Sequence, residues 1–182
     1  MKKKKSLMSA ILVAVVITVG SYYGLDLSEF FGTETVQSET FDVIKVIDGD
    51  TIKINYNGNE ENIRFLLIDT PELSHKQFDG PQPFAVEAKE KVEELLKERK
   101  VDIEIGIQER DKYGRLLGYL YVDGKSIQEE LLREGLARVA YVYNDKRNLD
   151  RYLEIEKEAK QEGRGIWSIE DYVTEDGYVN VK

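Results

Sequence analysis

Residues 62–72 of the chain read Asn-Ile-Arg-Phe-Leu-Leu-Ile-Asp-Thr-Pro-Glu, and this stretch decides the fold that we expect. Successive side chains of a strand point to opposite sides, so Asn62–Ile68 would be apolar on both faces. A strand of this kind is typically central, with a packed core on one face and a helix on the other. Arg64 is the exception, because it places a permanent charge on a strand that should be buried.

Strand patterns surround this stretch. We expect five strands, at Phe41–Val46, Thr51–Tyr56, Asn62–Ile68, Val101–Ile107 and Leu116–Val122. Asn57-Gly58, between the second and third strands, is typical of a type I′ hairpin turn.

Helical patterns interrupt and follow the strands. We expect three helices, from Pro83 to about Arg99, from Ser126 to Gly135 and from about Asp145 to Glu162. Ser126 and Glu129 have the spacing of a capping box at the start of the second helix. For the third helix we expect an inner face of Leu149, Tyr152, Leu153, Glu156 and Ala159. These patterns indicate an α+β fold built on a small closed barrel of the oligonucleotide-binding type.

The N-terminal residues differ from the rest of the chain. Lys2–Lys5 precede the uncharged stretch Leu7–Leu25, which indicates a hydrophobic helix over residues 1–25. It is either a cleaved signal peptide or a membrane anchor with its lysines in the cytoplasm. Either alternative puts the folded domain outside the cytoplasmic membrane. Residues 26–40 are polar and form the expected linker, residues 41–168 the folded domain, and residues 169–182 a C-terminal tail.

The composition excludes several kinds of site. There is no cysteine and only one histidine, so thiolate sites, cysteine nucleophiles and sites with two imidazoles are excluded. Removing residues 1–25 removes four lysines and no acid, which leaves 22 basic and 35 acidic residues and changes the net charge from -9 to -13. A protein that coats nucleic acid is normally basic. Any attraction to nucleic acid must therefore come from a local cationic site or a bound metal.

Polar residues gather in four short stretches where the pattern would favour apolar ones. They are Asp48-Gly49-Asp50-Thr51, Arg64, Asp69-Thr70-Pro71-Glu72 and Asp111-Lys112-Tyr113-Gly114-Arg115. Carboxylates at strand ends, together with carbonyl or hydroxyl oxygens, are ligands for calcium or magnesium. Strand alternation places Arg64 and Asp69 on opposite faces. Both can reach one site only if the chain leaves strand geometry near Ile68.

Each stretch also has a structural explanation. Asp-Gly-Asp is a common turn, and Asp-Thr-Pro-Glu is a common loop or helix start. Arg64 is explained equally by a buried ion pair, and Arg115 by an exposed strand position. The residues alone therefore support a phosphate-binding site made of a metal ion and arginines. They do not exclude the structural explanations.

The motifs together resemble the staphylococcal nuclease (thermonuclease) family, in order and spacing. The matching segments are Val-Ile-Asp-Gly-Asp-Thr, Ile-Arg-Phe-Leu-Leu-Ile-Asp-Thr-Pro-Glu, Asp-Lys-Tyr-Gly-Arg-Leu-Leu-Gly-Tyr, Gly-Leu-Ala-Arg-Val-Ala-Tyr-Val-Tyr and Gly165-Ile166-Trp167. The resemblance covers about Phe41 to Trp167 and excludes the N-terminal segment and the tail.

The resemblance implies a five-stranded oligonucleotide-binding barrel with three helices and a bound Ca²⁺. It implies metal ligands at Asp50, Asp69 and Thr70, and it implies that Asp48 is a nearby carboxylate in the outer shell of the metal. It implies catalytic roles for Arg64, Glu72 and Arg115, and nucleotide contacts from Lys112, Tyr113, Tyr141 and Tyr143. The implied reaction is hydrolysis of DNA and RNA to 3′-phosphate ends, with single strands preferred.

Two other kinds of protein remain to be weighed. One is a nucleic-acid-binding barrel without activity, which would lack some of the aspartates, the arginines or Glu72; all are present. The other is a surface adhesin or structural domain that merely binds calcium, which would not require two placed arginines. We expect a monomer that is secreted, or anchored to the outer face of the membrane through residues 7–25.

Overall fold

The computed structural model describes residues 39–74, 79–97 and 100–179. All of the described residues belong to one compact unit of the chain, Gln37–Lys182. The predicted N-terminal hydrophobic helix and linker residues 26–38 lie outside the described residues. Within the described ranges, none of the helices combines the length and the apolar composition that crossing a bilayer requires.

Seven strands form the main sheet in the described part of the chain. They are β1 (Glu39–Phe41), β2 (Val43–Val46), β3 (Thr51–Tyr56), β4 (Asn59–Phe65), β6 (Val101–Arg110), β7 (Leu116–Val122) and β8 (Lys125–Ser126). All five predicted strands are present. The first is divided at Asp42 and begins two residues earlier than expected, and the third ends at Phe65 instead of Ile68.

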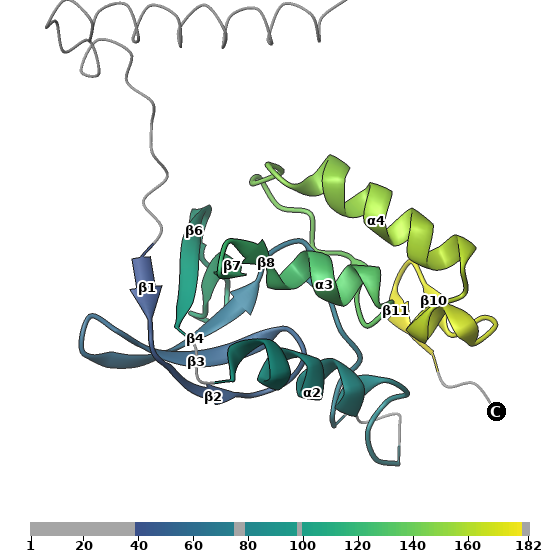
Figure 1. Ribbon diagram of the computed structural model, residues 1–182, viewed down its shortest axis with the longest axis horizontal. Helices are drawn as coiled ribbons and strands as arrows, with labels where there is room; N and C mark the ends of the chain where they lie inside the picture. The colour runs from purple at the N-terminus through teal and green to yellow at the C-terminus, as the bar shows by residue number, and fades with distance from the viewer. Residues whose placement is uncertain (1–38, 75–78, 98–99, 180–182) are drawn as a thin grey trace, which may run out of the picture. The chain divides into compact units, whose positions relative to one another are not determined.

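The strand order closes the sheet into a nearly complete barrel. Hydrogen-bonded neighbours run β1-β6-β7-β4-β3-β2, with β4 and β7 parallel and the other pairs antiparallel. The two ends of this order, β1 and β2, are separated in the chain only by Asp42, so the two edges of the sheet are brought together (Figure 1). The result is the expected α+β architecture of an oligonucleotide-binding barrel.

The central strand is buried, as its sequence predicts. Ile63 and Phe65 belong to the apolar core, and so do the three residues after β4, Leu66–Ile68. The turn before β4 has φ values of 52° at Asn57 and 80° at Gly58, the pair of positive values that a type I′ turn requires.

Three α-helices pack around the barrel within the described residues, namely α2 (Ala85–Leu96), α3 (Ile127–Arg133) and α4 (Leu149–Gln161). The predicted cap of α3 is confirmed, because Ser126 Oγ accepts a hydrogen bond from the amide of Glu129 at 3.2 Å. The start of α4 lies four residues after the predicted Asp145, since that aspartate has a different role described below.

The inner face of α4 differs in one position from the prediction. Tyr152, Glu156 and Ala159 are buried as expected, but Leu153 is 45% exposed and Ile155 is buried in its place. Ile155 follows Tyr152 by three residues and precedes Ala159 by four, so it falls on the same stripe of the helix. Leu153 lies about a quarter turn away from that stripe.

The residues after Ser168, expected only as a tail, are folded over most of their described length. A short 3₁₀ helix, η1 (Gly165–Ser168), precedes a two-stranded hairpin of β10 (Val173–Thr174) and β11 (Gly177–Tyr178). Tyr172 is fully buried before this hairpin, and its hydroxyl donates a hydrogen bond to the carbonyl of Pro83 at 2.9 Å.

Candidate active site

A break after β4 brings its polar residues together. Leu67 has a φ of 65°, a left-handed conformation that is rare and costly for a leucine. The chain then forms β5 (Ile68–Asp69), which pairs with β9 (Arg138–Val139) in a separate small sheet. Regular strand alternation would have kept Arg64 and Asp69 on opposite faces. The predicted departure from strand geometry is therefore confirmed.

The turn before β3 packs against the end of β4. The amide of Phe65 donates to the carbonyl of Asp50 at 2.8 Å, and the amide of Asp50 donates to Asp48 Oδ1 at 3.1 Å. Gly49 is needed here, because a Cβ at this position would lie 2.7 Å from Thr70 Oγ1. The Asp-Gly-Asp sequence is thus a closely packed turn that delivers Asp50 to the end of β4.

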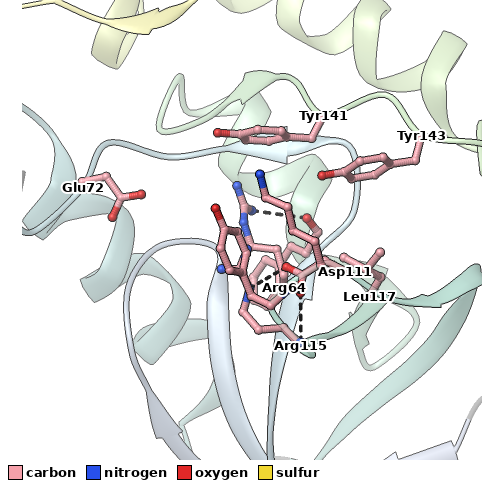
Figure 2. A pocket seen from close by; sticks show the side chains of 10 residues that line it. Arg64, Glu72, Asp111, Arg115, Leu117, Tyr141 and Tyr143 are labelled. Carbon is pink, nitrogen blue, oxygen red and sulfur yellow. Dashed lines mark hydrogen bonds and ion pairs between the residues drawn. The ribbon is translucent and has the colours of Figure 1, made fainter.

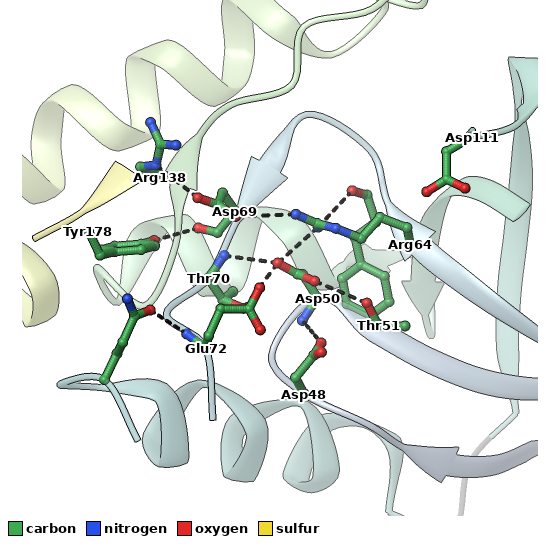
Figure 3. A network of polar contacts seen from close by, with 12 residues as sticks. Asp48, Asp50, Thr51, Arg64, Asp69, Thr70, Glu72, Asp111, Arg138 and Tyr178 are labelled. Carbon is green, nitrogen blue, oxygen red and sulfur yellow. Dashed lines mark hydrogen bonds and ion pairs between the residues drawn. The ribbon is translucent and has the colours of Figure 1, made fainter. Parts of the chain in front are cut away.

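Arg64 lies between two carboxylates, as Figure 3 shows. Its Nη1 is 2.9 Å from Asp50 Oδ2, and its Nη2 is 3.3 Å from Asp69 Oδ1. The amide of Thr70 also donates to Asp50 Oδ2, at 2.9 Å. All four residues are buried. The three predicted metal ligands therefore lie together around one guanidinium.

Two residues that were not predicted from the sequence also hold Asp69. Arg138 Nε donates to Asp69 Oδ2 at 3.0 Å, and the hydroxyl of Tyr178 donates to the Asp69 carbonyl at 2.7 Å (Figure 3). Arg138 stands in one of the motifs that carry the family resemblance, so the sequence held a signal for it. Tyr178 lies beyond Ser168, where no motif pointed to it.

Negative charge is in excess around Arg64. Burial and the neighbouring Asp50 carboxylate raise the pKa of Asp48 to about 7, and the same two causes raise the pKa of Asp69. Burial opposes a charge on Arg64, but the carboxylates of Asp50 and Asp69 prevail and raise its pKa, so it stays protonated. Carboxylates that repel one another in this way are stabilised by a further cation.

The donor set fits a hard divalent cation. It consists of the carboxylates of Asp50 and Asp69 and the backbone carbonyl of Thr70, all oxygens. Among the described residues, no group of three or more Asp, Glu or His side chains is arranged to hold a metal. A cation at this position would therefore depend on the Thr70 carbonyl and on water to complete its shell.

A cleft of about 520 Å³ opens beside Arg64 (Figure 2). Its lining includes Arg64, Glu72, Lys112, Tyr113, Arg115, Tyr141 and Tyr143, all of the residues predicted for catalysis or nucleotide contact. Tyr113 and Tyr141 are 72% and 53% exposed. Exposed aromatic faces beside cations are typical of sites where nucleic-acid bases stack.

The loop between β6 and β7 holds Arg115 at this cleft. Arg115 Nε is 2.8 Å from Asp111 Oδ2, and its amide donates to Asp111 Oδ1 at 3.0 Å. Burial raises the pKa of Asp111, but these hydrogen bonds prevail and lower it. The guanidinium carbon of Arg115 lies 5.7 Å from the centre of the Tyr113 ring, and that of Arg64 lies 5.3 Å from the Tyr141 ring. Each arginine thus has a tyrosine face beside it.

Glu72 lies between this cleft and a second cavity of about 370 Å³, which Asp69 and Thr70 also line. The amide of Glu72 donates to Gln82 Oε1 at 2.6 Å, and its carbonyl accepts from the Gln82 amide at 2.9 Å. Gln82 is buried and was not singled out from the sequence, which offers no motif for it. Its two hydrogen bonds hold the backbone of Glu72 beside the site.

Comparison with known proteins agrees with this geometry. A family described as staphylococcal nuclease homologue matches residues 62–169, which is more than half of the chain. The thermonuclease of Staphylococcus hyicus is 33% identical over 160 residues, covering 87% of this chain and 94% of that protein. The chain therefore belongs to the staphylococcal nuclease family.

Two Bacillus subtilis (strain 168) proteins are more similar in sequence but longer. The SPbeta prophage-derived endonuclease YokF is 50% identical over 136 residues, which cover 74% of this chain and 46% of that protein. Endonuclease YncB is 48% identical over 136 residues, which cover 74% of this chain and 64% of that protein. The chain thus spans about half to two thirds of the length of these two relatives.

Proposed function

We propose that the protein is a calcium-dependent nuclease that hydrolyses the phosphodiester bonds of DNA and RNA and leaves 3′-phosphate ends. The position of Arg64 carries this proposal. Its guanidinium contacts the buried carboxylates of Asp50 and Asp69 and also lines the tyrosine-rich cleft. A phosphate bound to Arg64 would therefore lie next to the oxygen donors. The names of the relatives, thermonuclease and endonuclease, support the same activity.

Hydrolysis requires a positioned water and neutralisation of the charge that develops on the phosphate. In the proposed reaction a water oxygen attacks phosphorus and gives its proton to Glu72. The bond from phosphorus to the 5′ oxygen breaks, and that oxygen takes a proton from solvent. Arg64 and Arg115 donate hydrogen bonds to the non-bridging oxygens, which a planar guanidinium can grip at two points.

Asp50, Asp69 and Thr70 would hold the calcium, and Asp48 would orient the turn that carries Asp50. When bound, the cation would polarise a phosphate oxygen. We propose calcium because two carboxylates and a carbonyl leave an irregular, partly hydrated shell, which calcium accepts more readily than magnesium.

The lining of the cleft supports the proposal that the substrate is single-stranded and is bound without regard to base sequence. Tyr113, Tyr141 and Tyr143 offer ring faces for stacking, and Lys112 adds a cation for the backbone. Bases can stack on these rings only when they are not paired, so single strands of either sugar type should be preferred.

The test is degradation of single-stranded DNA and RNA in a calcium titration, followed by analysis of the product ends. We expect turnover to require calcium, to yield 3′-phosphates and to fall at least 100-fold in Glu72→Gln. Glu158→Gln, an exposed carboxylate on α4, is the matched control and should retain activity. Full turnover in excess chelator would contradict the calcium requirement. Binding without cleavage would identify a non-catalytic barrel instead.

We further propose that the protein acts outside the cytoplasmic membrane, either secreted or anchored through residues 7–25. The support is the lysine-rich and then apolar composition of residues 2–25. Protease digestion of intact cells tests this proposal. Protection of the nuclease domain from added protease would contradict it.

A further inference from the structure

The hairpin of β10 and β11 contacts the site from outside the part of the chain that matches the family. The match ends at residue 169, whereas the hairpin spans Val173–Tyr178. The hairpin also lines the second cavity, the one that Asp69, Thr70 and Glu72 share. This position indicates that the hairpin has a role in the site.

Tyr178 provides the first contact. Its hydroxyl donates to the backbone carbonyl of Asp69 at 2.7 Å, which fixes the main chain at the residue whose carboxylate faces Arg64 (Figure 3). The ring of Tyr178 packs against Tyr172, with ring centres 5.3 Å apart. Because Tyr172 is fully buried, it holds the Tyr178 ring in place.

Arg138 provides the second contact. Its Nε donates to Asp69 Oδ2 at 3.0 Å, while its Nη1 donates to the carbonyls of Thr174 and Glu175 at 3.3 and 3.2 Å. The guanidinium carbon also lies 5.7 Å from the centre of the Tyr178 ring. The hairpin therefore sets the orientation in which Arg138 meets the Asp69 carboxylate.

We propose that the C-terminal hairpin positions Asp69 for metal binding, through Tyr178 on its carbonyl and Arg138 on its carboxylate. Asp69 is then held on three sides, by Arg64, Arg138 and Tyr178. This inference rests on the proposed function, in which Asp69 is a calcium ligand. Tyr178 and Arg138 are positioning residues in this scheme, and partners of this kind commonly affect metal affinity by about 10–100-fold.

The experiment compares Tyr178→Phe with Tyr172→Phe in the full chain. Both variants lose one tyrosine hydroxyl and its hydrogen bond to a backbone carbonyl, but only Tyr178 contacts Asp69. We expect calorimetric titration to show calcium affinity about tenfold weaker in Tyr178→Phe and within about twofold of the parent in Tyr172→Phe. Thermal midpoints should fall by similar amounts in both, which separates positioning from general stability. Equal calcium affinity in all three proteins, or equal weakening in both variants, would overturn the proposal.

A second measurement needs no metal. The amide of Thr70, next to Asp69, donates to Asp50 Oδ2 at 2.9 Å, so its hydrogen exchange reports the local geometry. We expect faster exchange of this amide in Tyr178→Phe than in Tyr172→Phe. If the parent protein binds no calcium, the proposed metal site is wrong. The exchange result then still decides whether the hairpin positions Asp69, and unchanged exchange would overturn that role.

Discussion

Arg64 and Arg115 carry the same charge in different surroundings. The Arg64 side chain is 10% exposed and is paired with two buried carboxylates. The Arg115 side chain is 31% exposed and is paired with Asp111, which makes it the more accessible of the two arginines. Under the proposed function both guanidinium groups bind the same phosphate. Catalysis should therefore depend on both, whereas stability should depend mainly on Arg64.

Arg64→Lys and Arg115→Lys should each reduce turnover strongly. Lysine keeps the charge but removes the planar, two-point grip on phosphate oxygens. We expect a loss of about 3–4 kcal/mol in transition-state stabilisation, judged from the removal of single oxyanion donors. Single-strand cleavage assays measure this loss, with Arg151→Lys on α4 as the control. Near-parental turnover in either variant would remove that arginine from the catalytic set.

The same variants should differ in stability. Arg64→Lys leaves buried hydrogen-bond acceptors less well paired and should lower the free energy of unfolding by about 1–3 kcal/mol. Arg115→Lys changes a partly exposed pair and should cost less than about 1 kcal/mol. Urea midpoints in chelator measure both. A larger loss in Arg115→Lys would contradict the burial argument.

At the scale of elements, two of the three cleft tyrosines lie on a segment without regular secondary structure. Tyr141 and Tyr143 stand between β9 and α4, where backbone hydrogen bonds of helix or sheet are missing. Asp145 anchors this segment. It is 1% exposed, and its Oδ2 accepts from the amide of Ile107 on β6 at 3.1 Å. Arg147 also donates to Asp145 Oδ2, at 2.8 Å.

Asp145→Asn should destabilise the protein in a pH-dependent way. Burial raises the pKa of Asp145, but hydrogen bonds from Arg147 and Ile107 prevail and lower it. The usual pKa of an aspartate is near 3.8. Because the folded state lowers the pKa of Asp145, its carboxylate stabilises the fold at pH values above 3.8. This stabilisation is lost as the pH falls through the lowered pKa. We expect a deficit of about 2 kcal/mol at neutral pH, which shrinks in acid. Denaturant titrations across this range test the trend, and a constant deficit would contradict it.

The short strand β1 contributes to the closure of the barrel. Glu39 and Thr40 pair with Ile103 and Asp102 on β6, so a chain that begins at Phe41 loses most of β1. We expect chains beginning at Gln37 and at Phe41 both to unfold cooperatively, because the apolar core is intact in each. The shorter chain should have a midpoint lower by about 2–5 °C in calorimetry. Equal midpoints would show that β1 does not contribute to stability.

For the whole molecule, the balance of charge limits how nucleic acid is bound. The chain carries a net charge of -9, so attraction must come from the cations that line the cleft, Arg64, Lys112 and Arg115, or from a bound metal.

This balance predicts weak salt dependence. Each phosphate neutralised on a single strand contributes about -0.7 to the slope of log affinity against log salt, so three contacts predict a slope of about -2. Binding of a single-stranded oligonucleotide to Glu72→Gln, measured between about 50 and 200 mM salt, tests this value. A slope of about -5 or steeper would indicate further phosphate contacts outside the cleft.

The sequence by itself determined the barrel strands, the type I′ turn at Asn57-Gly58 and the cap at Ser126. Each of these depends on local periodicity or local hydrogen bonds. The sequence also predicted the catalytic and nucleotide-binding residues that gather at the cleft, because the spacing of the motifs carried the family resemblance. The ends of the helices and the buried face of α4, where Leu153 is exposed, were less well predicted, because packing between elements decides them.

Only the tertiary structure decided how the site is held together. Arg64 meets Asp69 because Leu67 adopts a left-handed conformation, which is not a preference of leucine and must be imposed by the surrounding core. Tyr178 reaches Asp69 across 109 positions of sequence, a contact that no local pattern specifies. Contacts between residues so far apart in the sequence form only when whole elements pack together. Their physical cause is therefore the folded core and not any one segment.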